Sequence, residues 1–158
     1  MIRFRRDFLF YIITKRIDRF RVNLPEDWGD GHDHVSICST YETQDMVDYR
    51  LPIFLSLPIK HKAIICEPLL EQINLSHWLT PSIEEVIVGG ESGNNARICN
   101  YDWVLDIRTQ CIEKKVSFHF KQTGARFVRG DHLYFIKIQD QHSQVTKANV
   151  VLDGFWLH

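Results

Sequence analysis

Residues 84–93 read EEVIVGGESG, and this stretch decides the fold. The β-branched run 86–88 is short and is closed at once by glycines, which is the pattern of a buried strand. Gly89 and Gly90 suit a tight exit from such a strand, where another part of the backbone comes close. The same unit, an apolar run followed by a polar loop, recurs along the chain.

The recurring apolar runs predict a parallel sheet. Strands that alternate with helices are typical of parallel sheets joined by right-handed crossovers. We predict an α/β fold with a five-stranded, mainly parallel sheet built from β-loop-α repeats. It is either an open sheet or a partial TIM-type barrel, because five strands do not close an eight-stranded barrel. The predicted strands are residues 8–13, 35–39, 62–66, 86–88 and 116–120.

Helices are predicted between these strands. Residues 44–49 and 53–57 are expected to be separate pieces, because Pro52 interrupts the pattern. Apolar residues at helical spacing predict a longer helix over 103–114, with Asp102 as its N-cap.

After Gly124 the pattern changes to a small C-terminal β appendage. Arg129-Gly130-Asp131 indicates a turn, and residues 133–138 and 150–152 are expected to be strands. We therefore expect a partial-barrel domain over residues 1–128 and a hairpin-like appendage over residues 129–158 that packs on it.

Composition narrows the classes of function. The chain has 158 residues, 44% of them apolar and 25% charged, as in an ordinary globular domain. With a net charge of −1 the chain has no global basic field that would favour a nucleic-acid partner, although such a partner stays open, and no apolar stretch is long enough to span a membrane. Isolated cysteines without a CxxC pair indicate reduced thiols, a cytoplasmic protein and no metal site. They are Cys38, Cys66, Cys99 and Cys111.

Polar side chains follow the predicted strands, at the edge where the carboxyl ends of a parallel sheet meet. Such edges hold the sites of many α/β proteins, and their mixed charge suits a small anionic or zwitterionic ligand. Ion pairing for solubility is the structural alternative. Glu67 and Glu91 are the candidate catalytic pair for acid–base chemistry. The expected ligand-binding rim consists of Thr14, Lys15, Arg16, Glu42, Glu67, Glu91, Ser92, Lys121 and Gln122.

Several segments carry a family resemblance: IITKRIDRF, LPEDWGDG, LPIFLSLPIKHKAIICEPLL, VIVGGESGNNAR, DWVLDIRTQC and FKQTGARF. They resemble a bacteriophage and prophage family of unknown function, named for phage gene products thirty-seven and sixty-eight. The resemblance extends from about Phe8 to Lys147. It implies a radical-SAM-like partial barrel, which in full-length relatives opens with a three-cysteine motif. That motif would hold a [4Fe–4S] cluster and present S-adenosylmethionine.

This chain departs from those relatives in its first part. It resembles only their C-terminal portion, from the third strand onward, and its own cysteines do not replace the three-cysteine motif. No cluster or other cofactor is therefore expected in this chain. The tail from about Asn149 also departs from the family pattern. The matching rim residues Lys15, Glu67, Glu91 and Lys121 keep their places.

These observations leave three functions open. The first is a cluster-free remnant of a phage-derived, radical-SAM-like barrel that keeps a polar ligand-binding rim. The second is an interaction subunit, in which a partner chain or a second copy covers the apolar edge Phe8–Ile13. The third is a small acid–base enzyme that uses Glu67 and Glu91.

Overall fold

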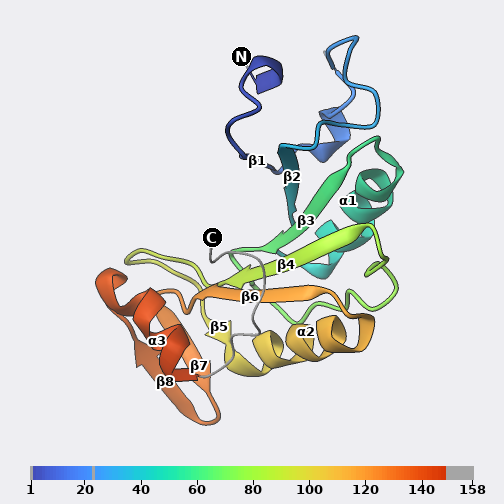
Figure 1. The fold of residues 1–158 in the computed structure, drawn as a ribbon. Helices are drawn as coiled ribbons and strands as arrows, with labels where there is room; N and C mark the ends of the chain where they lie inside the picture. The colour runs from blue at the N-terminus through green and yellow to red at the C-terminus, as the bar shows by residue number, and fades with distance from the viewer. Residues whose placement is uncertain (1, 23, 149–158) are drawn as a thin grey trace.

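The computed structural model describes residues 2–22 and 24–148. Its centre is a parallel sheet in the order β1-β2-β3-β4-β6, which follows the order of the chain (Figure 1). The sheet is open, with β1 and β6 at its two edges. The predicted α/β class and the open five-stranded sheet are therefore confirmed. The strands are β1 Phe10–Thr14, β2 Val35–Thr40, β3 His61–Cys66, β4 Ile83–Gly89 and β6 Ser117–Gln122.

The two long helices, α1 (Gln44–Ser56) and α2 (Tyr101–Lys114), lie on the same side of the sheet (Figure 1). Their apolar stripes bury the main core against that face of the strands. Core residues from both layers include Leu51, Phe54, Val104, Ile107, Ile64, Val86 and Phe118. The opposite side is called here the open face. It carries a separate small cluster, in which Ile87 packs against Cys38, Ala63 and Ile65.

The edge strand β1 differs from its prediction. The unbroken apolar run at residues 8–13 predicts a strand buried on both faces, but Tyr11 and Ile13 are exposed while their neighbours in β1 are half-buried. The alternation arises because α1 and α2 cover only one face of the sheet. Beyond this strand, residues 2–4 and 17–19 form short 3₁₀ turns, η1 (Ile2–Phe4) and η2 (Ile17–Arg19).

The predicted break at Pro52 is wrong, because α1 runs through the proline without ending. Proline removes one helical hydrogen bond and crowds the preceding turn. Here Val47, Leu51 and Phe54 are fully buried against the sheet, and this packing outweighs the local cost. At the start of α2 the cap is also shifted: Asn100 accepts a hydrogen bond from the backbone N–H of Asp102, at 2.9 Å.

The predicted appendage is present beside β6 (Figure 1). β7 (Arg126–Arg129) and β8 (His132–Phe135) form an antiparallel hairpin, and β5 (Cys99–Asn100) pairs with β7. A 3₁₀ turn, η3 (Ile138–Asp140), leads into helix α3 (Gln141–Ala148), which the sequence patterns did not predict. The expected strand at 150–152 and the tail from about Asn149 lie outside the described residues. The proposed division after residue 128 stays a prediction.

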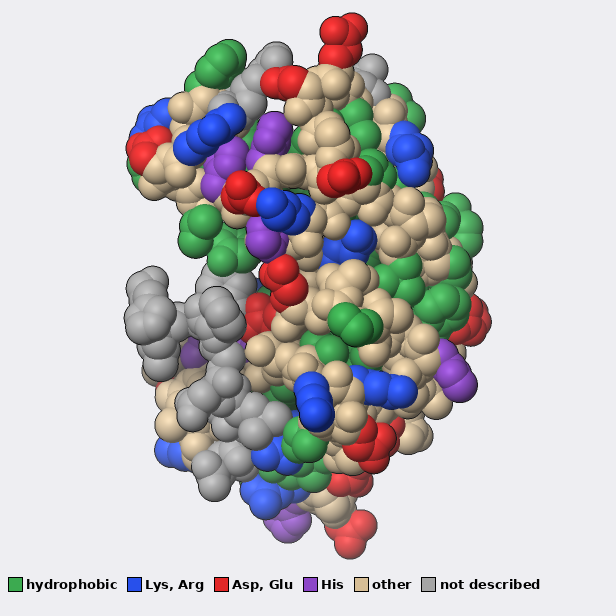
Figure 2. Space-filling model, turned by 45° about the vertical axis from the view of Figure 1, so that its right-hand side comes forward, with side chains coloured by type: hydrophobic (Ala, Val, Ile, Leu, Met, Phe, Trp, Pro, Cys, Tyr) green, Lys and Arg blue, Asp and Glu red, His purple; other side chains and the backbone are tan. Residues whose placement is uncertain are grey.

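Within the described ranges, none of the helices is long and apolar enough to cross a membrane. The surface in Figure 2 carries basic and acidic side chains that are interspersed over the face it displays.

Candidate functional site

A cleft of about 470 Å³ lies on the open face, at the carboxyl ends of the strands. We call it the rim cleft. Register places Thr40, Ile65, Ile87 and His119 side by side across β2, β3, β4 and β6. Ile13, Ile65 and Ile87 supply its apolar surface. Its polar residues are Lys15, Thr40, Glu67, His119 and Lys121.

Glu67, the first residue after β3, ties the ends of β3 and β6 together. Its carboxylate accepts a hydrogen bond from Gln122 Nε2 and lies 2.9 Å from Lys121 Nζ. The carboxylate reaches across β4 because Gly89 has no side chain. A Cβ at Gly89 would lie 3.0 Å from Cδ of Glu67. The sequence therefore positions an acceptor, a cation and an amide at one point of the rim.

A second ion cluster forms around Glu42. Lys15 Nζ lies 2.6 Å from one of its carboxylate oxygens, and Arg50 Nη1 lies 3.0 Å from the other. Arg50 also donates to the carbonyl of Thr40 at 2.7 Å. Burial by itself would raise the pKa of Glu42, but the hydrogen bond and charge of Lys15, together with Arg50, outweigh it and lower that pKa. Glu42 thus orients Lys15 at the mouth of the rim cleft.

Glu91 is held by a single arginine. Arg97 donates through Nε at 2.9 Å, through Nη2 at 2.7 Å and through its backbone N–H at 2.8 Å. These hydrogen bonds lower the pKa of Glu91 to about 2. The carboxylate is therefore ionised at neutral pH and already accepts three hydrogen bonds.

The remaining predicted rim residues take different positions. Ser92 Oγ lies 2.7 Å from Gln141 Oε1 and 3.2 Å from Gln122 Oε1, so it joins the rim to the appendage. Thr14 accepts a hydrogen bond from the backbone of Arg16, and the guanidinium of Arg16 pairs with Asp18. Of the predicted rim residues, three line the rim cleft, namely Lys15, Glu67 and Lys121. Six do not, namely Thr14, Arg16, Glu42, Glu91, Ser92 and Gln122.

Sequence reasoning missed three contributors to this region, namely Arg50, Arg97 and His119. Arg50 lies on a helix and Arg97 in a loop, and no local pattern marks either of them as a partner of a rim carboxylate. His119 alternates with Phe118 and Phe120 along β6, so it lies on the open face while they are buried on the helix-covered face. Burial, followed by the charges of Lys121 and His142, lowers the pKa of His119.

The cysteines do not fit a [4Fe–4S] cluster, which needs several thiolates that converge on one point. All four are free and buried. Burial raises the pKa of Cys38 to about 11 and the pKa values of Cys99 and Cys111 to about 12, which favours the protonated thiol. Nowhere in the described part of the chain do three or more metal-binding side chains gather.

Comparison with known proteins gives one family. The model of a family described as a protein of unknown function (DUF5131) matches residues 1–155. Neither the curated proteins nor the solved structures contain a significant match.

Proposed function

The chain belongs to the DUF5131 family, whose description assigns no activity, and we propose a function from its own residues. The rim cleft binds a small anionic or zwitterionic organic molecule, without an iron–sulfur cluster. The chain is a phage-derived, radical-SAM-like partial barrel that works in the cytoplasm. The segments that resemble the phage family support its origin, and its reduced, buried thiols support its location.

The observation that carries the proposal is the setting of Glu67 and Lys121. Both border an apolar cleft, and their opposite charges lie 2.9 Å apart at its edge. Lys15 adds a second cation to the same edge. Carboxylate or phosphate groups of a ligand would bind the lysines, and an ammonium group would bind Glu67. Ile65 and Ile87 would contact the apolar part of the ligand.

The contacts of the two glutamates support ligand binding better than acid–base catalysis. Glu91 accepts three hydrogen bonds from Arg97, so it must be released before it can move a proton. Glu67 is likewise engaged by Lys121 and Gln122. The acid–base pair expected from the sequence stays a prediction.

We expect S-adenosylhomocysteine, a zwitterion, to bind the full chain in isothermal titration calorimetry. The Lys121→Met variant should bind about tenfold more weakly, since a hydrogen bond to a charged group contributes roughly 1.5–3 kcal/mol. Lys114→Met is the matched control, because Lys114 is exposed in the last turn of α2. Equal affinities of the two variants, or no binding by the wild type, would overturn the proposal.

A second candidate function, self-association through β1, is favoured by the exposed edge of the sheet. Leu9 is 71% exposed and Ile13 is 63% exposed, and among the described strands β1 pairs only with β2. In an antiparallel pairing of two β1 segments centred on residue 11, Leu9 would lie opposite Ile13 of the second copy. The same register sets Asp7 opposite Lys15, which carries the opposite charge.

The self-association candidate predicts a dimer that dissociates on dilution, measured by sedimentation velocity. Leu9→Lys should shift the protein to monomer, because it places a charged side chain opposite Ile13 at both symmetric points of the interface. Leu133→Lys makes the same change at an exposed position of β8 and should leave the dimer intact. A wild type that stays monomeric at every concentration would eliminate this candidate.

A further inference from the structure

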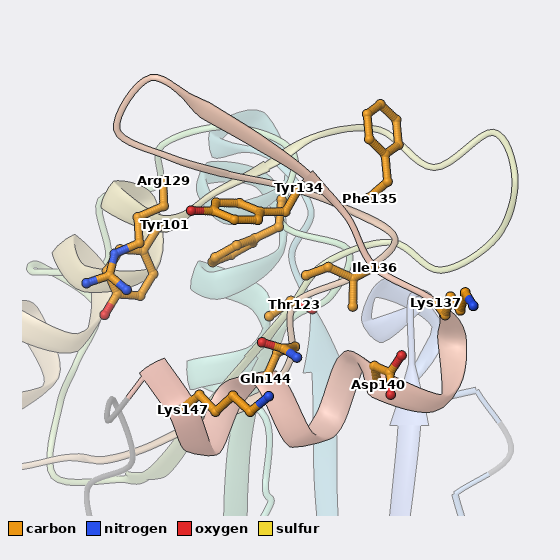
Figure 3. Close-up of a pocket in the computed structure, with 11 residues that line it drawn as sticks. Tyr101, Thr123, Arg129, Tyr134, Phe135, Ile136, Lys137, Asp140, Gln144 and Lys147 are labelled. Carbon is orange, nitrogen blue, oxygen red and sulfur yellow. The ribbon is translucent and has the colours of Figure 1, made fainter.

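The appendage contains its own cavity, separate from the rim cleft. Its volume is about 470 Å³, and it lies between the β7–β8 hairpin, the start of α2 and helix α3 (Figure 3). We call it the appendage pocket. The residues that line it include Tyr101, Phe127, Arg129, Tyr134, Gln144 and Lys147.

One wall of the appendage pocket is aromatic. Tyr101 and Phe127 meet edge to face with ring centroids 5.8 Å apart, and Phe127 stacks on core residue Phe120. This packing anchors the wall to the main domain. Tyr134 extends the wall toward solvent, with 45% of its surface exposed. Figure 3 shows its ring reaching toward Tyr101 and Arg129. A flat π surface is thus held in place before any ligand arrives.

The pocket is also basic. The guanidinium of Arg129 lies 4.9 Å from the centroid of the Tyr101 ring. Lys147 stands on α3, across from the hairpin (Figure 3). Neither cation forms a salt bridge with an acidic residue in the ranges that the structure describes. This contrasts with the rim, where Lys15 and Lys121 are both neutralised by glutamates.

We propose that the appendage pocket binds a nucleotide. The base stacks on the ring of Tyr134, the phosphate lies between Arg129 and Lys147, and the amide of Gln144 is available to hydrogen-bond a base edge. Aromatic stacking beside arginine is the usual means by which proteins hold unpaired bases. An acidic peptide would use the cations but would gain little from the aromatic wall. The nucleotide is either free or part of a single strand.

The test is fluorescence anisotropy with the full chain and a fluorescein-labelled fifteen-nucleotide oligothymidylate. The Tyr134→Ala variant should weaken binding about tenfold or more, the range typical of one stacked base. Arg129→Gln should weaken it and reduce its salt dependence. Tyr49→Ala is the matched control, because it makes the same change at a 56% exposed position of α1 and Tyr49 does not line the appendage pocket.

Competitors identify the source of the nucleotide. If unlabelled dTMP displaces the probe at concentrations similar to those of the oligonucleotide, the ligand is a free nucleotide. If only the oligonucleotide competes, it is a single strand. Absence of binding, equal binding by Tyr134→Ala and Tyr49→Ala, or equal competition by a polyglutamate peptide would overturn the proposal. Lys121→Met should leave the anisotropy titration unchanged, which separates this site from the rim cleft.

Discussion

Replacing Gly90 by alanine is expected to lower the free energy of unfolding by about 3 kcal/mol, the upper part of the range for overpacking. A Cβ at Gly90 would lie 2.2 Å from the carbonyl oxygen of Thr123 and 2.9 Å from the backbone nitrogen of Gly124. Backbone atoms cannot rotate away as a flexible side chain can. The exits of β4 and β6 cross here, so separating them would disturb both the sheet and the rim.

Gly130→Ala is the matched control for the Gly90 substitution. Gly130 lies in the hairpin turn with φ of +57°, and an added Cβ would meet nothing within 4 Å. Gly130→Ala should lower the free energy of unfolding by only about 1 kcal/mol, the cost of placing alanine in a left-handed backbone conformation. Urea unfolding of both variants measures the difference. Equal losses would show that the two strand exits are not in close contact.

The second large effect is expected from Phe118→Ala, which should cost about 4 kcal/mol because it removes a large side chain from a packed core. Phe118 is fully buried between β6 and the helical layer. Its removal leaves a cavity between β6 and α2. The sheet and the helix cannot readily move together to close it.

Phe135→Ala is the same chemical change at an exposed position of β8 and should alter the free energy of unfolding by about 0.5 kcal/mol or less. Thermal and urea unfolding of the two variants check that Phe118 belongs to the packed core and that Phe135 does not. If Phe135→Ala were the more destabilising, Phe118 would not belong to the packed core between β6 and the helices.

The sheet was predictable because each strand combines an apolar run with a clear stop. The run at 86–88 became the centre of β4, with Gly89 and Gly90 at its exit. Because all five strands are parallel, the residues after them had to gather at one edge. That inference placed Glu67 near Lys121, and the structure shows an ion pair between them.

Other features depended on tertiary packing that no local pattern reports. Pro52 looked like a helix break, but the burial of Leu51 and Phe54 keeps α1 continuous. Helix α3 has few apolar residues, and Val145 is buried only because the helix packs against the end of the sheet. The pairing of Glu91 with Arg97 depends on the path of a loop, so the sequence predicted the carboxylate but not its partner.

The most direct test of the rim cleft as a ligand site is methyl NMR of isoleucine-labelled protein during a titration with S-adenosylhomocysteine. Ile13, Ile65 and Ile87 line the cleft, whereas Ile37 and Ile64 are buried on the helix-covered face. We expect the δ1-methyl signals of Ile13, Ile65 and Ile87 to shift and those of Ile37 and Ile64 to stay unmoved. Shifts confined to Ile136 in the appendage pocket, or no shifts at all, would contradict it.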